Sequence, residues 1–236
     1  QFPMGIFAIA IGTVLLPSLS KAYAQEEIQV YTEQLEHAFK LVFFLAIPSL
    51  IGLALFASPL LATIFQRGAF LWSDVQQASL SLVGFSFGLP FFMAMKVLVP
   101  AFFSRQNTKT PMLIAFLSLL INISLNYLLA FYLGLGHLGL AIASSISAIV
   151  SVIILSFILN RDGLISFSGI LSTFSLKVLM ASVALISFLS IFNQHFDFEL
   201  FTQAQRLLHL AAAVIGSLII YFGASFILGV RPADFR

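Results

Sequence analysis

Residues 138–159 read LGLAIASSISAIVSVIILSFIL, 22 positions in a row without a charged side chain. An α-helix rises about 1.5 Å per residue, so this run is about 33 Å long as a helix. That length matches the hydrocarbon core of a bilayer, which is about 30 Å thick. A transmembrane β-strand would be a shorter segment of alternating polarity. The run therefore predicts a transmembrane helix.

Similar apolar runs recur along the whole chain, with short polar breaks between them. We place them at about 2–20, 41–65, 75–103, 111–133, 138–159, 171–192 and 206–229. The pattern predicts an all-α fold, a polytopic transmembrane helical bundle of about seven spans.

The composition excludes several classes of protein. Only 8% of the 236 residues are charged and 60% are apolar, whereas a soluble globular domain has about 25% charged residues. A disordered chain, a nucleic-acid-binding domain and an ordinary cytosolic enzyme are therefore excluded, and we expect no nucleic-acid partner. The chain has no Cys, and its four His lie in separate segments. We accordingly expect no metal site, no cofactor and no catalytic residues.

Lys and Arg in the breaks between spans predict the orientation. One set of loops holds eight cations, counting one at its membrane edge: Lys21, Lys40, Arg105, Lys109, Arg161, Lys177, Arg231 and Arg236. The other set holds Arg67 and Arg206. Because cytoplasmic loops carry the excess of cations, we expect the first set and the C-terminus to be cytoplasmic.

The one long polar stretch, Tyr23–Lys40, has apolar residues at helical spacing. Ile28, Tyr31, Leu35 and Phe39 recur every three or four positions. This pattern predicts an amphipathic helix at the cytoplasmic interface. A solvated connector between spans is the simpler interpretation, and a partner-binding helix is the alternative.

Lys96 lies inside a predicted span and belongs to neither set of loops. A Lys at mid-membrane depth costs about 2.5–3.5 kcal/mol on the insertion scale, so it needs a partner, water or a route to the interface. Two interpretations stay open: a snorkelling anchor, or a cation that lines a water-filled cavity and meets an anionic substrate. Pro90 and Pro100 flank Lys96, and Pro48 lies in an earlier span. We expect helix kinks at these three prolines, as in transporters with broken helices.

Polar residues also occur in two neighbouring spans. Asn122 and Asn126 lie one helical turn apart, and Ser144 lies in the next span. Amides and hydroxyls at such positions join helices across a membrane. We therefore expect helix contacts, with a cation site built from their oxygens as the alternative.

The segment 96–111, KVLVPAFFSRQNTKTP, closely resembles a signature of the MurJ (MviN) family, which reads approximately K-V-L-x-P-x-F-Y-[SA]-R-Q-D-x-[KR]-T-P. Phe103 stands where the family usually has Tyr, and Asn107 where it usually has Asp. The opening run with Leu16-Pro17-Ser18 and the segment 65–70, FQRGAF, also resemble the family's eighth transmembrane helix and its next external loop.

The resemblance implies a lipid II flippase of the multidrug/oligosaccharidyl-lipid/polysaccharide exporter superfamily. Such a protein has fourteen helices in a two-lobe transporter of the bacterial cytoplasmic (inner) membrane. By alternating access it moves lipid II, the undecaprenyl-pyrophosphate-linked peptidoglycan precursor, from the cytoplasmic to the outer leaflet. Lys96, Arg105 and Lys109 match motif positions and are the candidates for substrate binding.

The same resemblance implies a division of the chain. Residues 1–162 would be most of the second lobe, and 163–236 two additional C-terminal helices beside a groove for the lipid tail. The sequence starts Gln1-Phe2-Pro3. We expect a longer protein, with a missing N-terminal lobe as the partner of this half and with membrane lipids around both.

Other functions remain as alternatives. A related polysaccharide-precursor or multidrug exporter would lack the 96–111 signature. A polyprenyl-phosphate membrane enzyme would gather Asp, His or Arg in one interfacial loop, which no loop here does. A structural subunit would tolerate loss of Lys96.

Overall fold

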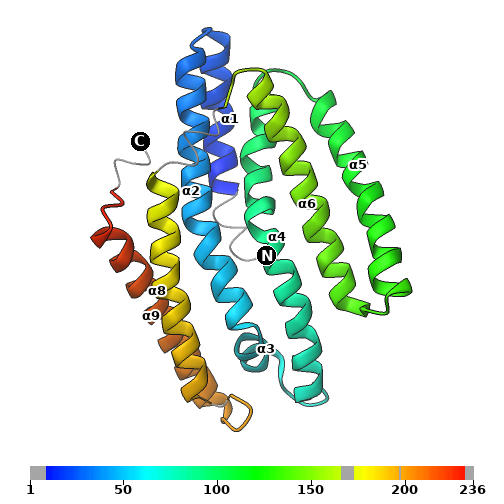
Figure 1. Ribbon diagram of the computed structural model, residues 1–236, viewed down its shortest axis with the longest axis vertical. Helices are drawn as coiled ribbons and strands as arrows, with labels where there is room; N and C mark the ends of the chain where they lie inside the picture. Colours follow the sequence, from blue (N-terminus) through cyan, green and yellow to red (C-terminus); the bar gives the residue numbers. More distant parts are fainter. Residues whose placement is uncertain (1–8, 166–172, 197, 232–236) are drawn as a thin grey trace.

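Figure 1 shows the computed structural model, which describes residues 9–165, 173–196 and 198–231. Every regular element in these ranges is helical, which confirms the all-α prediction. The elements are α1 (Ile9–Ala24), α2 (Ile28–Leu55), α3 (Ala57–Phe65), α4 (Trp72–Phe103), α5 (Lys109–Asn126) with its π-helical continuation η2 (Tyr127–Tyr132), α6 (Gly136–Arg161), α8 (Thr173–His195) and α9 (Gln203–Ile227).

Six of these segments are long and apolar enough to cross a membrane: α2, α4, α5 with η2, α6, α8 and α9. The chain is a multi-pass membrane protein. The seventh predicted span, 2–20, lies partly outside the described residues, and α1 has 16 residues within them. The described part of the chain therefore holds six spans and α1.

The predicted helix over Tyr23–Lys40 is wrong in its boundaries. α1 ends at Ala24, a turn follows, and α2 runs without a break from Ile28 to Leu55. The reason is that Tyr31, Leu35 and Phe39 are buried in a core with residues of α1 and α4. The apolar stripe packs inside the protein, not on a membrane surface, and the same helix continues as a span.

The predicted span 41–65 is divided at Phe56. α2 ends before this residue and α3 begins after it, with Pro59 in the first turn of α3. Proline lacks the N–H that would continue α2, but it fits the first turn of a new helix. Pro48, Pro90 and Pro100 instead lie inside α2 and α4, which continue through them. Kinks at these positions stay a prediction.

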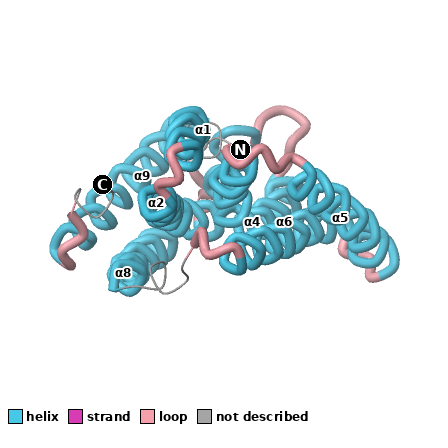
Figure 2. The backbone as a smooth tube through the Cα atoms, turned by 90° about the horizontal axis from the view of Figure 1, so that it is seen from above, coloured by secondary structure: helices cyan, strands magenta, loops and turns pink. Residues whose placement is uncertain are grey.

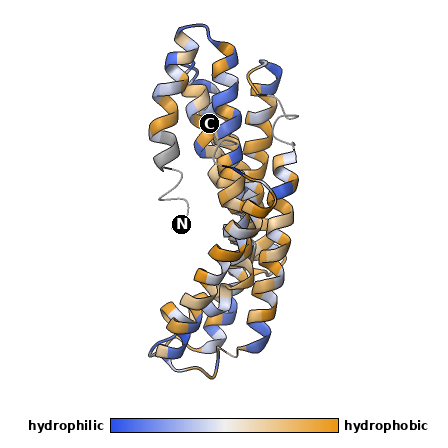
Figure 3. Ribbon diagram, turned by 90° about the vertical axis from the view of Figure 1, so that its left-hand side faces the viewer, coloured by the Kyte–Doolittle hydropathy of each residue, from blue (hydrophilic) through white to orange (hydrophobic). Residues whose placement is uncertain are grey.

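The long helix α4 is the centre of the bundle. It packs against α6, α2, α1 and α3. Seen from above, α4, α6 and α5 lie in a row, with α5 at the edge (Figure 2). On the other side, α8 and α9 pack on each other and α8 packs on α2. Hydrophilic residues gather toward the two ends and apolar residues fill the middle (Figure 3).

Close packing of α4 on α6 depends on small residues. The Ser145 hydroxyl of α6 donates a hydrogen bond of 2.7 Å to the carbonyl oxygen of Gly84 on α4. A Cβ atom added at Gly88 would lie 2.9 Å from Cα of Ser145. Glycine lets the two backbones approach closely, as membrane helices with small-residue interfaces do.

The two ends of the bundle differ. The α1–α2 turn, the α4–α5 turn and the end of α6 lie together, and we call this the Arg105 end. At the opposite end, the α3 end, lie α3, the α3–α4 loop, the α5–α6 turn and the α8–α9 loop (Figure 1).

Candidate functional site

The 96–111 segment forms the last two turns of α4 and the turn into α5. α4 ends in a Schellman motif, in which Asn107 N–H bonds to the Phe102 carbonyl at 3.1 Å and Gln106 N–H to the Phe103 carbonyl at 2.9 Å. Gln106 has φ 57°, a left-handed conformation that usually favours glycine. The Asn107 side chain then accepts a 3.2 Å bond from the N–H of Thr110 in the first turn of α5.

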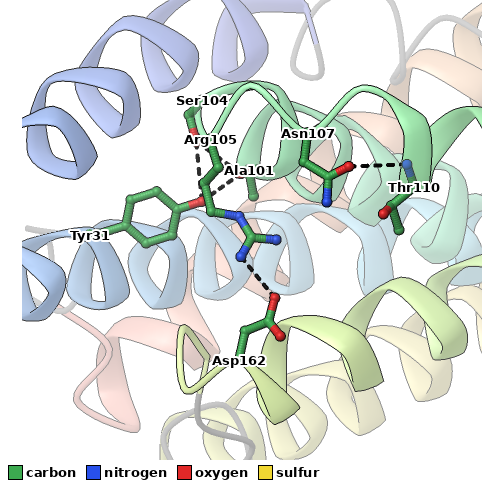
Figure 4. A network of polar contacts seen from close by, with 7 residues as sticks. All are labelled: Tyr31, Ala101, Ser104, Arg105, Asn107, Thr110 and Asp162. Carbon is green, nitrogen blue, oxygen red and sulfur yellow. Dashed lines mark hydrogen bonds and ion pairs between the residues drawn. The ribbon is translucent and has the colours of Figure 1, made fainter.

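Arg105 joins this turn to the end of α6 (Figure 4). Its Nη1 lies 2.8 Å from Oδ2 of Asp162, in the break after α6. The Arg105 side chain is only 9% exposed and the Asp162 side chain 38%. The guanidinium carbon also lies 5.0 Å from the centre of the Phe102 ring, a cation–π distance. Arg105 therefore ties α4 to α6.

Tyr31 of α2 also contacts the end of α4, so that α2, α4 and α6 meet at one junction. Its buried hydroxyl donates to the Ala101 carbonyl at 2.6 Å and lies 3.2 Å from Oγ of Ser104 (Figure 4). The Ser104 hydroxyl donates to the same Ala101 carbonyl at 2.9 Å. Because helix-terminal carbonyls have no backbone partner within the helix, these two hydroxyls satisfy it. In the sequence, Tyr31 is recognisable only as part of an apolar stripe, and Asp162 only as one residue of a polar break.

Lys96 and Lys109 are not part of this junction. Both side chains are exposed, and neither makes a hydrogen bond or an ion pair to another described residue. Lys96 lies seven residues before the end of α4 at Phe103, which is about 10 Å along the helix axis. Lys109 is the first residue of α5. The structure therefore brings together Arg105 and Asp162 and leaves the two lysines apart.

Asn122, Asn126 and Ser144 form a chain of hydrogen bonds between α5 and α6. Asn126 Nδ2 donates to Asn122 Oδ1 at 3.0 Å, and Asn122 Nδ2 donates to Ser144 Oγ at 3.3 Å. Ser144 Oγ donates in turn to the Leu140 carbonyl at 3.0 Å. This geometry favours helix contacts. Oδ1 of Asn126 is buried without a partner in the described part of the chain, so the cation site stays an open alternative.

An apolar groove with a volume of about 550 Å³ lies among α2, α8 and α9. Its walls include Pro48 and Gly52 of α2, Leu185 and Leu189 of α8, and a face of α9 that ends at Tyr221 and Phe222. None of the described residues that line it carries a charge. The groove therefore suits a hydrocarbon chain and has no charged group for a polar ligand.

Comparisons with known proteins agree on one family. The family model described as "Lipid II flippase MurJ" matches residues 1–207. The chain is 34% identical over its whole length to a probable lipid II flippase MurJ of Vibrio cholerae and 33% identical over 98% of its length to one of Haemophilus influenzae. It covers 45% and 46% of these two proteins, so it spans about half the length of the curated relatives it matches.

A solved structure shows the same arrangement of helices. It is titled "Lipid II flippase MurJ, inward closed conformation", and it matches 96% of the present chain with a TM-score of 0.74 and 26% identity. The present chain covers 44% of that structure.

Proposed function

The chain belongs to the MurJ family of lipid II flippases, and from this we propose that it forms the C-terminal half of a protein that flips lipid II. The chain spans about half of its relatives' length, so flipping requires the other half. We propose a transporter and not an enzyme, located in the bacterial inner membrane with the Arg105 end and the C-terminus on the cytoplasmic side. The excess of Lys and Arg at that end supports this orientation.

The observation that carries the proposal is the apolar groove among α2, α8 and α9. Lipid II has a long polyprenyl chain, which must stay out of water while the head group crosses the membrane. A groove of about 550 Å³ without charged lining residues could hold this polyprenyl chain against apolar side chains and away from water. The groove involves the two C-terminal helices, as the family resemblance implies.

The candidates for contact with the pyrophosphate are the two free lysines. Lys96 is exposed within a span, where an unpaired ammonium is costly unless water or an anion meets it. Lys109 lies at the N-terminus of α5, where the helix dipole adds positive potential. Neither lysine lines the groove. We propose that the missing lobe completes a cavity over them.

We assign Arg105 a positioning role. Its side chain is nine-tenths buried and pairs with Asp162 through Nη1, while Nε and Nη2 are buried without a hydrogen-bond partner among the described residues. In alternating access the two lobes rock as bodies, and the α4–α5 turn would have to move with α6. The Arg105–Asp162 pair and the Tyr31 hydroxyl support such a rigid junction.

Replacement of the resident flippase in living cells tests the proposal. The full-length protein is expressed while the resident copy is depleted, and lipid II accessible from outside the cell is measured. We expect the wild-type protein to restore accessible lipid II, and Lys96→Ala to restore at most about a tenth of it. A wild-type protein that inserts in the membrane at normal levels and restores none would contradict the proposal.

A further inference from the structure

A second cavity, of about 760 Å³, lies at the α3 end of the bundle. It is walled by the end of α2 and the start of α3, by the first turns of α4, and by the end of α8 with the loop that follows. Figure 1 shows α3 and the α8–α9 loop together at this end. The cavity shares no lining residue with the apolar groove.

The lining of this α3-end cavity is uncharged and combines apolar residues with a smaller set of polar groups. Six side chains with hydrogen-bonding groups line it: Ser58, Trp72, Gln76, Ser79, Asn193 and Gln194. The Ser79 hydroxyl donates a 2.6 Å bond to the Val75 carbonyl, and the other five side chains make no hydrogen bond to another described residue. None of the described residues that line the cavity is charged. Three free amides, a hydroxyl and an indole N–H from three parts of the chain therefore converge on one space.

Hydrogen bonds and ring packing hold the described residues of the α8–α9 loop in place. Arg206, which is 6% exposed, donates from Nε to the Phe198 carbonyl at 2.8 Å and from Nη2 to the Glu199 carbonyl at 3.0 Å. The ring of Phe198 packs edge-on against Phe56 at 6.1 Å between centroids. Gln203 holds the start of α9 to α3 through a 2.6 Å bond to the Thr63 carbonyl. The cavity is thus preformed, as ligand sites usually are.

The electrostatics of the cavity disfavour an anion. Asn193 and Gln194 lie in the last turn of α8, whose C-terminal end carries partial negative charge. At the start of α4, Asp74 accepts a 2.8 Å bond from Leu71 N–H and so takes part of the site where an anion would bind. A phosphate would meet no arginine or lysine among the described lining residues.

A neutral, hydroxylated ligand fits these groups. Each amide offers both a donor and an acceptor, as each sugar hydroxyl does. The indole of Trp72 provides an apolar face with one polar edge, which suits the C–H face and the hydroxyl rim of a pyranose ring. We propose that the α3-end cavity binds a saccharide. This site goes beyond lipid II flipping and does not depend on it.

The test is a titration of the full-length protein in lipid nanodiscs with the free disaccharide N,N′-diacetylchitobiose. Trp72 is the one tryptophan of this sequence, so the difference in emission between the wild type and Trp72→Phe isolates its signal. We expect a saturable change in this signal. The double variant Gln76→Leu/Asn193→Leu keeps the side-chain size and removes two amides, and its Kd should be at least about tenfold weaker.

Gln77→Leu is the matched control, because Gln77 is exposed on the same helix and does not line the cavity. Its Kd should equal that of the wild type. If the double variant does not fold, Gln194→Leu on the exposed end of α8 repeats the test, with an expected loss of about threefold or more. No saturable signal, an equal Kd in the amide variants, or displacement of the disaccharide by dodecanol would overturn the proposal.

The source of the saccharide is settled in a second titration. Displacement of the disaccharide by lipid II would identify the ligand as the head group of a lipid-linked substrate. No displacement would identify it as a free saccharide. Either result supports saccharide binding in the α3-end cavity. Flipping is measured separately. An amide variant that loses the disaccharide and still flips lipid II retains this site as well, whereas loss of flipping with normal sugar binding bears only on the proposed function.

Discussion

The hydroxyl of Tyr221 on α9 donates a hydrogen bond of 2.7 Å to the backbone carbonyl of Phe44 on α2. This carbonyl lies four residues before Pro48, which has no N–H to bond to it. A carbonyl buried in a membrane without a partner costs several kcal/mol. The C-terminal helix thus satisfies the defect that the proline leaves in α2, at the wall of the apolar groove.

Tyr221→Phe removes this donor and should destabilise the protein by about 1–3 kcal/mol, because the Phe44 carbonyl stays buried. Thermal unfolding of the full-length protein in detergent measures the loss. In a Pro48→Ala background the new N–H of residue 48 bonds to Phe44, so the cost of Tyr221→Phe should fall by at least half. An equal loss of stability in both backgrounds would show that the Tyr221 hydroxyl does not replace the hydrogen bond that Pro48 cannot donate.

The Arg105–Asp162 pair should show coupling in a double-mutant cycle. Hydrogen bonds to charged groups contribute about 1.5–3 kcal/mol, and the 38% exposure of Asp162 places this pair toward the lower figure. Arg105→Ala, Asp162→Ala and the double variant are compared by thermal unfolding. Arg105→Lys should recover only part of the stability, since an ammonium lacks the planar face over Phe102. Additive single costs would contradict the pairing.

Gly88→Ala tests the close contact of α4 with α6. The added Cβ would lie 2.5 Å from Oγ and 2.9 Å from Cα of Ser145, and the backbone atom cannot move alone. We expect a loss of about 1–3 kcal/mol in unfolding free energy. Gly223→Ala on α9 is the control, because a Cβ there meets nothing within 4 Å, and it should be neutral or stabilising by up to about 1 kcal/mol.

Ser217→Phe should obstruct the apolar groove, because Ser217 lines it from α9. Ile215→Phe is the matched control on the same helix, at a position that is 57% exposed and outside the groove. Photo-crosslinking with a lipid II analogue that carries a diazirine in its polyprenyl chain measures occupancy. We expect at least about a fivefold drop in α9 crosslinks for Ser217→Phe alone. An equal crosslinking yield in both variants would show that the polyprenyl chain does not occupy this groove.

The fold and the family could be predicted from the sequence because their signals are local. Twenty-residue apolar runs specify membrane helices whatever surrounds them, and the structure confirms that fold. The 96–111 signature indicates the family, which the family model confirms. The helix boundaries near residues 23–65 could not be predicted correctly. They depend on Tyr31, Leu35 and Phe39 packing against α1 and α4, a contact between distant segments.

The contacts of the candidate site could not be predicted, because each joins positions far apart in the chain. Arg105 and Asp162 are 57 positions apart, Tyr31 and Ala101 are 70 apart, and Tyr221 and Phe44 are 177 apart. Sequence reasoning placed Arg105 beside Lys96 and Lys109 as a substrate cation. The structure shows its guanidinium paired with Asp162, and the roles of the two lysines stay predictions.

The rate at which lipid II crosses proteoliposomes that contain the full-length protein tests the proposed flippase most directly. Lys96→Ala is compared with the wild type and with Lys40→Ala. Lys40 lies in α2 and belongs to the set of cations that we expect on the cytoplasmic side. We predict flipping by the wild type, an unchanged rate for Lys40→Ala, and a rate at least about tenfold lower for Lys96→Ala with equal insertion and thermal stability. A wild-type protein that flips no faster than empty liposomes, or a Lys96→Ala protein as fast as the wild type, would contradict the assignment.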